Sequence, residues 1–213
     1  MKTEELIAAL AADNATVAPP ISRTVLIALG IGALLAAAHF ASMLPMRSDF
    51  AYSITHEPRF IFKFVFTLAI AIPALLLVLE LARPNGSGRA SAWMLAVPVA
   101  MLALAVGYEM MTVPADHWRV YAVGSNSLAR MKFIPLLAAA PFVAMLYALR
   151  NGAPANPAAA GAAAGVVSGA IAATFYASHC IDDSPMFLAI WYTIGIGAVT
   201  ALGAVIGSRL LRW

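Results

Sequence analysis

The feature of this sequence that most constrains its fold is a series of long apolar stretches with few or no charged residues. A helix needs about 20 mostly apolar residues to cross a membrane, because the hydrocarbon core is about 30 Å thick and a helix rises about 1.5 Å per residue. Six stretches are predicted to reach this length: 23–47, 59–82, 89–109, 130–150, 151–181 and 184–208. The second and fourth reach it only if Lys63 and Lys132 extend their ammonium groups toward the membrane surface.

The balance of apolar and charged residues also indicates a membrane protein. Of the 213 residues, 62% are apolar and 11% are charged, whereas soluble domains have roughly 45–50% apolar and about 25% charged residues. A water-soluble fold of this size could not bury so much apolar surface. We therefore predict an all-α integral membrane bundle of six transmembrane helices over residues 21–213, preceded by a cytoplasmic segment of residues 1–20.

The orientation of the bundle follows from the number of spans and from the charges of the loops. An even number of spans places both termini on one side of the membrane. A cytoplasmic placement puts seven of the 13 Lys and Arg residues inside and six outside, which favours it only slightly. The acidic loop residues cluster on the predicted outside, and the inner loops are almost purely basic.

Several functions are not expected from this sequence. The net charge of +3 comes from scattered Lys and Arg residues rather than a basic block, so direct nucleic-acid binding is not predicted. Cys180 is the single cysteine, which excludes an intramolecular disulfide. Because the chain has no Gly-rich phosphate loop, no paired-cysteine motif and no nucleophile triad pattern, we do not expect an enzyme.

Glycines recur at four-residue spacing in the last two spans, at Gly161, Gly165 and Gly169 and again at Gly203 and Gly207. Such a stripe lets two helix backbones approach closely, and this packing favours helix association in lipid. We expect the fifth and sixth helices to pack against each other. A homodimer face is the alternative that the pattern leaves open.

Three ionisable residues are predicted to lie at similar depth near the outer ends of their helices: His39, Lys63 and Glu109. A charge within the membrane is costly unless it is paired, and a Lys63–Glu109 ion pair with His39 nearby would reduce that cost. The group would then act as a proton-sensitive switch. The alternatives are a purely structural pair and side chains that extend to the interface without pairing.

A polar sequence connects the last two spans, His179-Cys180-Ile181-Asp182-Asp183-Ser184-Pro185. Its thiol, imidazole and carboxylates are suited to a transient soft or borderline metal ion, with Cys180 and His179 as the ligands, and the thiol is also open to oxidation. Together with Asp182 and Asp183, these two residues form what we call the predicted sensing group. The alternative is an ordinary N-terminal cap for the last helix, since Ser184 precedes a proline at the first turn.

The N-terminal segment predicts a short amphipathic helix. Thr3 is placed to cap it, and Glu4 and Glu5 lie in its first turn, where carboxylates are favourable. A narrow apolar strip is formed by Leu6, Ile7 and Leu10. Such a helix is suited to docking a cytoplasmic protein, although a segment of this length would also fray when free.

The chain resembles the NrsF-type membrane anti-sigma factors of proteobacteria over essentially its whole length. The stretches that carry the resemblance are Met1-Lys2-Thr3-Glu4-Glu5-Leu6-Ile7, Arg59-Phe60 with Lys63, Leu149-Arg150-Asn151-Gly152-Ala153-Pro154, His179 to Pro185 with Trp191-Tyr192, and Gly207-Ser208-Arg209-Leu210-Leu211-Arg212-Trp213.

This resemblance implies a multi-pass protein of the bacterial inner membrane that retains an extracytoplasmic-function sigma factor at its cytoplasmic face and releases it on metal or oxidative stress. The N-terminal residues listed above would bind the sigma factor. The family pattern has two periplasmic cysteines, of which Cys180 matches one, and Ser127 stands where the other is expected. Serine cannot supply a thiolate, so a paired-thiol sensor is not expected here. The rival hypothesis is a small transporter or ion-binding membrane protein that uses the layer of His39, Lys63 and Glu109.

Overall fold

The computed structural model describes residues 3–5, 7, 19–125 and 131–212. This part of the chain consists of helices and the loops that connect them, and it contains no strands. Its elements are α2 (Ile21–Met43), α3 (Phe50–His56), α4 (Pro58–Leu81), α5 (Arg89–Met94), α6 (Ala96–Thr112), the 3-10 turn η1 (Ala115–His117), α7 (Trp118–Val123), α9 (Phe133–Leu149), α10 (Pro157–Ala177), α11 (Pro185–Phe187), the π-helical turn η2 (Leu188–Tyr192) and α12 (Thr193–Leu210). The predicted all-α class is therefore confirmed.

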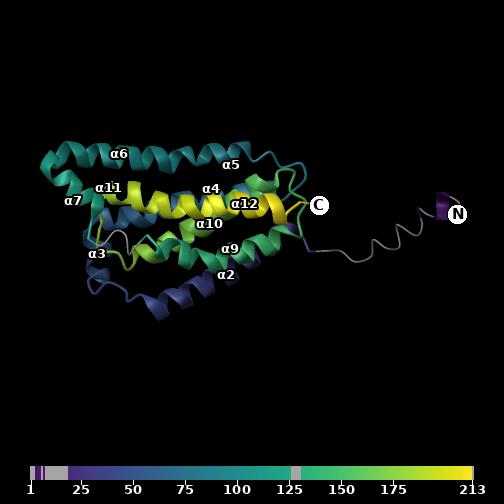
Figure 1. Cartoon of the computed structure of the whole chain (residues 1–213), viewed down its shortest axis with the longest axis horizontal. Coiled ribbons are helices and arrows are strands. Elements are labelled where there is room, and N and C mark those ends of the chain that lie inside the picture. Colours follow the sequence, from purple (N-terminus) through teal and green to yellow (C-terminus); the bar gives the residue numbers. More distant parts are fainter. Residues whose placement is uncertain (1–2, 6, 8–18, 126–130, 213) are drawn as a thin grey trace.

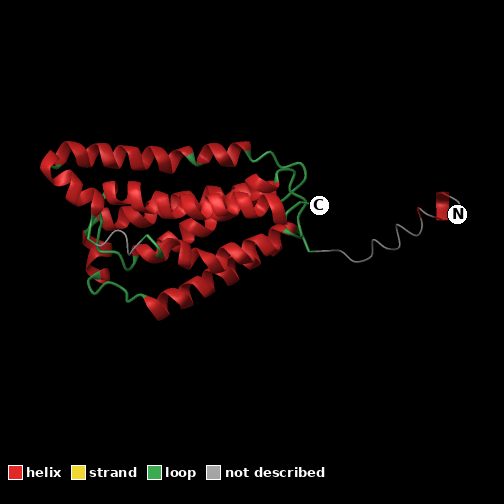
Figure 2. Ribbon diagram, viewed as in Figure 1, coloured by secondary structure: helices red, strands yellow, loops and turns green. Residues whose placement is uncertain are grey.

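The long helices run along a common direction between two ends of a bundle (Figure 1). Helix α10 lies at its centre and packs against α12, α4, α9 and α2, while α5 and α6 pack along α4. Figure 2 shows that loops collect at the two ends and that helix fills the space between them. This arrangement places the polar connections away from the apolar middle.

The lengths of the helices are compatible with five of the six predicted spans. Five helical segments are long and apolar enough to cross a membrane, namely Ile21–Met43, Pro58–Leu81, Arg89–Thr112, Pro157–Ala177 and Pro185–Leu210. The fourth predicted span differs, because its helix Phe133–Leu149 has 17 residues and Lys132 lies before it as the N-cap. At about 1.5 Å per residue that helix is about 26 Å long, slightly shorter than the hydrocarbon core. A count of six spans therefore stays a prediction.

The glycine stripes of α10 and α12 face each other, as predicted. A Cβ atom on Gly161 would overlap the carbonyl oxygen of Gly203, and one on Gly165 would lie 2.6 Å from the carbonyl oxygen of Val199. A Cβ atom on Gly207 would lie 2.6 Å from the carbonyl oxygen of Pro157. The two backbones are thus in contact along most of their length, which only glycine permits. Whether the chain also dimerises stays a prediction.

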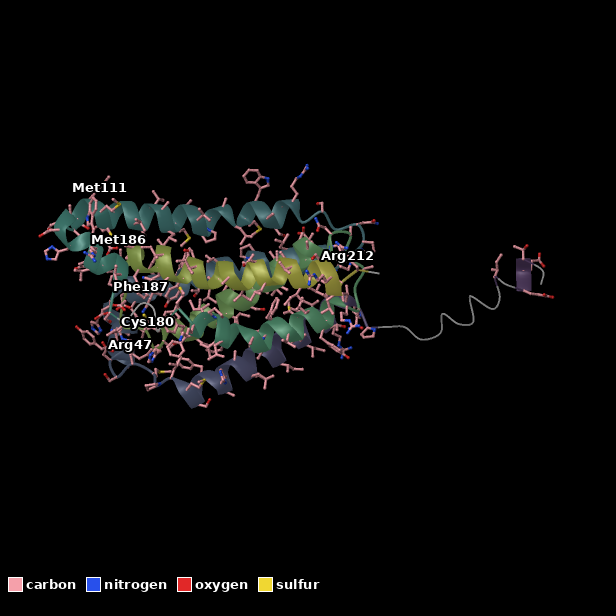
Figure 3. All side chains as sticks on the ribbon, in the orientation of Figure 1. Arg47, Met111, Cys180, Met186, Phe187 and Arg212 are labelled. Atoms are coloured by element: carbon pink, nitrogen blue, oxygen red, sulfur yellow. The ribbon has the colours of Figure 1, made fainter. Side chains whose placement is uncertain are left out.

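The two ends of the bundle differ in what they contain. We call the end with the loops 44–49, 113–117 and 178–184 the loop end, and the end where α2 begins and α12 finishes the terminal end. Figure 3 places Arg47, Cys180 and Phe187 at the loop end and Arg212 at the terminal end.

Candidate functional site

The carboxylate of Asp183 joins three segments at the loop end. Its Oδ1 atom lies 2.5 Å from Nζ of Lys63, and its Oδ2 atom lies 2.9 Å from Nη1 of Arg47. The Lys63 ammonium also donates a 2.7 Å hydrogen bond to the backbone carbonyl of Cys180. The Lys63 side chain is completely buried, and that of Asp183 is 14% exposed. Because a buried ammonium is costly without a counter-charge, Asp183 is required to keep Lys63 in place.

Arg47 connects the loop after α2 to the same cluster. Its guanidinium donates to Asp49 through Nε at 2.6 Å and Nη2 at 2.7 Å, and its Cζ lies 4.8 Å from the centre of the Phe60 ring. The two hydrogen bonds from Arg47 lower the pKa of Asp49 to about 2, and the hydrogen bonds to Asp49 and Asp183 raise the pKa of Arg47. The backbone N–H of Arg47 donates to the carbonyl of Ser178 at 3.1 Å. The arginine is thus fixed at its side chain and its backbone.

Glu109 forms a second cluster with different partners from those predicted. Its Oε2 atom accepts hydrogen bonds from Oγ of Ser184 at 2.7 Å and from the backbone N–H of Met186 at 3.0 Å. Its Oε1 atom lies 3.3 Å from Nη1 of Arg59, an ion pair without hydrogen-bond alignment. The predicted Lys63–Glu109 pair is wrong for the described residues, because Lys63 pairs with Asp183 and Glu109 pairs with Arg59.

His39 does not join either cluster. It is half-buried on α2, and none of the hydrogen bonds or ion pairs found among the described residues uses its ring. Its backbone carbonyl accepts a hydrogen bond from Oγ of Ser42 at 2.8 Å. The predicted layer of three residues is therefore replaced by two clusters at the loop end, one around Asp183 and one around Glu109.

The predicted N-terminal cap of the last helix is confirmed. Oγ of Ser184 accepts hydrogen bonds from the backbone N–H groups of Met186 at 3.1 Å and Phe187 at 3.4 Å, and Pro185 occupies the first turn. The same hydroxyl donates to Glu109. Ser184 therefore caps the last helix and also links its start to Glu109 on α6.

Cys180 and His179 point to different surroundings. The Cys180 side chain is buried, with the residue 1% exposed, and its Sγ atom lies 3.8 Å from the carbonyl oxygen of Asp182. Nδ1 of His179 lies 2.7 Å from the carbonyl oxygen of Pro45. No group of three or more His, Cys, Asp and Glu side chains that could hold a metal occurs in the part of the chain that the structure describes.

The loop after α7 approaches the sensing group. The backbone N–H and the hydroxyl of Ser125 each lie 3.4 Å from a carboxylate oxygen of Asp182. Nearby, the indole Nε1 of Trp191 donates to the carbonyl of Ala122 at 3.0 Å. Ser127, the predicted position of a second thiol, lies outside the described residues.

Two surface pockets open beside these clusters. One has a volume of about 340 Å³ and is lined by Arg59, Val120, Tyr121 and residues 181–184. The other, of about 710 Å³, is lined by His56, Glu57, Pro58, Arg59, Tyr108, Thr112, Val113 and Asp183. Arg59 and Asp183 line both, so the polar loop can be reached from outside through either pocket.

The N-terminal segment is only partly described. Thr3, Glu4, Glu5 and Ile7 are helical and exposed. Leu6 and Leu10, the other members of the predicted sigma-binding group, lie outside the described residues. The predicted helical start is therefore consistent with the residues that can be seen, and its binding role stays a prediction.

The family of the chain follows from its sequence similarity to known proteins. The sequence matches the family NrsF, described as negative regulator of sigma F, over residues 10–213. The chain belongs to the NrsF family. It is 36% identical to the anti-sigma-F factor NrsF of Caulobacter vibrioides (strain NA1000 / CB15N), over 217 aligned residues that cover all of both chains. It is also 32% identical to the probable anti-sigma-F factor NrsF of Azospira oryzae, again over the full length of both proteins. No solved structure matches the chain. The resemblance expected from the sequence motifs is thus confirmed for this NrsF-family protein.

Proposed function

We propose that this NrsF-family chain is a membrane-embedded anti-sigma factor that retains an extracytoplasmic-function sigma factor at the inner membrane. The observation that carries the proposal is the similarity over the whole of both chains to a relative named as an anti-sigma-F factor. The apolar helices support a membrane location, since five are long enough to cross a bilayer. The family is regulatory, which agrees with the expectation that the chain is not an enzyme.

In the proposed topology the terminal end faces the cytoplasm and the loop end faces the periplasm. The start of α2 and the end of α12 lie at the same end of the bundle, as an even number of crossings requires (Figure 1). The segment of residues 1–20 would then enter the cytoplasm, where Glu4, Glu5 and Ile7 offer an acidic and apolar surface to the sigma factor.

The signal would act at the opposite end, on the loop that contains Cys180. Asp182 contacts the loop after α7 and Asp183 contacts α4 and the loop after α2, so a change in this loop reaches three other segments. Helix α10 precedes the loop and α11 follows it, and α10 and α12 remain in backbone contact toward the terminal end. A periplasmic metal or oxidant that altered the loop would thereby shift the helices next to the sigma-binding side.

The rival transporter hypothesis receives less support. A transport site is expected near the middle of the bilayer, often where a helix is broken. Lys63 lies close to the start of α4 and Glu109 close to the end of α6. Both charges are occupied by ion pairs at the loop end and do not line a path through the bundle.

Co-purification tests the proposed function. A tagged chain is extracted from its own membranes with mild detergent, and each extracytoplasmic-function sigma factor of the cell is probed in the eluate. One sigma factor should be retained, and its target promoters should become active when the gene for the chain is deleted. Retention of none, together with unchanged promoter activity in the deletion strain, would refute the proposal.

A further inference from the structure

The Asp183 carboxylate is the only acid that the described ion pairs place on the buried Lys63, and it is shared with Arg47. These two cations come from different segments, α4 and the loop after α2. Asp183 itself belongs to the loop between α10 and the last helix. One side chain therefore ties together three segments that are distant in the sequence.

We infer that Arg47, Lys63 and Asp183 form a charge latch. Their ion pairs hold the 178–184 loop in the closed position, in which Cys180 is buried, and thereby keep the protein in its repressing state. The inference deepens the proposed function and rests on it for the repressing state, whereas the closed loop is a property of the chain alone.

The contacts around Cys180 explain why the latch controls this part of the loop. The Lys63 ammonium binds the Cys180 carbonyl at 2.7 Å and the Asp183 carboxylate at 2.5 Å. Both ends of the Cys180–Asp183 stretch are therefore held by one ammonium group that is completely buried. Loss of the Asp183 charge leaves that ammonium without its counter-ion, and the buried position of Lys63 becomes unfavourable.

Arg47 holds the same loop through further contacts. Its guanidinium reaches Asp183, and its backbone N–H binds the carbonyl of Ser178. The Nδ1 atom of His179 lies 2.7 Å from the carbonyl of Pro45, two residues before Arg47. The segment 45–47 therefore covers the loop at Ser178, His179 and Asp183. Release of Asp183 removes the charged part of this cover.

The single cysteine makes the state of the latch directly measurable. Cys180 is 1% exposed, so a maleimide should react with it slowly while the latch is closed. Lysed membranes let the reagent reach both faces, which makes the measurement independent of topology and of any sigma factor. The reporter for sigma-dependent transcription is measured in parallel, with the membrane level of each variant.

Asp183→Asn keeps the shape of the side chain and removes its charge. Maleimide labelling of Cys180 should become at least about ten-fold faster, since breaking a buried ion pair by removing one partner is strongly destabilising. The reporter should rise toward its level in a strain that lacks the chain. Asp116→Asn is the matched control, because Asp116 is 76% exposed, lies at the loop end and pairs only with His117 among the described residues. It should change neither readout.

The double variant Lys63→Met with Asp183→Asn removes both charges and should label more slowly than Asp183→Asn alone, because it leaves no unpaired buried ammonium. It also decides the case in which Asp183→Asn fails to accumulate: labelling faster than in the unchanged chain, together with a raised reporter, supports the latch, and labelling and repression equal to those of the unchanged chain overturn it.

Asp183→Asn that reaches the membrane at a normal level with unchanged labelling would overturn the inference. Faster labelling without a rise of the reporter, in a strain where deletion of the chain does raise it, would also overturn it, since the loop would then be unconnected to repression. If deletion itself leaves the reporter unchanged, the proposed function has failed, and the labelling rates still decide whether the latch closes the loop.

Discussion

Gly161 of α10 and Gly203 of α12 lie in backbone contact, so close that a Cβ atom on either would overlap the carbonyl oxygen of the other. Gly203→Ala should therefore destabilise the bundle, since overpacking costs about 1–3 kcal/mol. Replacing glycine by alanine within a helix otherwise gains roughly 0.5–1 kcal/mol. Gly197→Ala is the control on the same helix, because a Cβ atom there meets nothing within 4 Å. Thermal unfolding in detergent should show a lower Tm for Gly203→Ala and an unchanged or higher Tm for Gly197→Ala; equal values would contradict the close packing.

The partners of Glu109 can be identified by a double-mutant cycle. Arg59→Ala and Glu109→Gln should show a coupling free energy of about 0.5–3 kcal/mol, as expected for residues in contact. Lys63→Met and Glu109→Gln should show a smaller coupling, because Lys63 pairs with Asp183 and Glu109 pairs with Arg59. Unfolding in detergent measures both cycles. A larger coupling for the Lys63 cycle would restore the pairing expected from the sequence.

The topology can be measured with introduced cysteines. Cys180 is too buried to report it, so Cys180→Ser serves as the background. In that background Asp116→Cys, at an exposed position of the loop end, should react with an impermeant maleimide in intact spheroplasts. Asn151→Cys, exposed after α9 near the terminal end, should react only after lysis. The opposite pattern would reverse the orientation of the bundle.

The pKa of Asp49 provides a test of the Arg47 contacts. The hydrogen bonds from Arg47 lower this pKa from 3.8 to about 2. A lowered folded-state pKa means that the stabilisation is present above the unfolded value and is lost as the pH falls from about 4 through about 2. Carboxyl 13C NMR in detergent should find Asp49 ionised at pH 3, and Arg47→Gln should return its midpoint toward 3.8. An unperturbed midpoint in the unchanged chain would show that the loop contacts are absent in solution.

The role of the N-terminal segment is tested by deletion of residues 2–14. The bundle should still reach the membrane at a normal level, because the described contacts among its helices are made by residues 19–125 and 131–212. Retention of the sigma factor should be lost, and sigma-dependent transcription should rise to the level of a strain without the chain. Glu4→Gln with Glu5→Gln should weaken retention to a lesser degree, since the apolar strip remains. Full repression by the shortened chain would exclude the segment from the interface.

The sequence predicted the helices well because their signals are local. Hydropathy located the spans, the glycine spacing identified the contact between α10 and α12, and Ser184 with Pro185 marked the start of the last helix. The fourth span was overextended, because a lysine at the membrane surface fits either the first turn of a helix or the position just before it. Lys132 takes the second.

The ion pairs of the site could not be predicted in the same way. The position of Lys63 and Glu109 along their apolar stretches predicts which helix end each residue lies near, and it correctly placed both near the loop end. It does not give the direction in which each side chain points around its helix, so the pairing with each other was wrong. Arg47 was not singled out. Its local partner Asp49 is visible in the sequence as an oppositely charged neighbour, but Asp183 lies 136 residues away.

That sequence distance has a consequence for biosynthesis. A ribosome completes Arg47 and Lys63 long before Asp183, and chains assemble from the N-terminus first. In the proposed membrane topology, the helix that contains Lys63 would therefore insert before the carboxylate that neutralises its ammonium has been made. The ion pairs of the loop end can form only after the 178–184 loop has been made. A chain truncated within α10 should therefore expose an uncompensated charge that membrane quality control can recognise. The final third of the polypeptide thus supplies the carboxylate that neutralises two charges made in the first third.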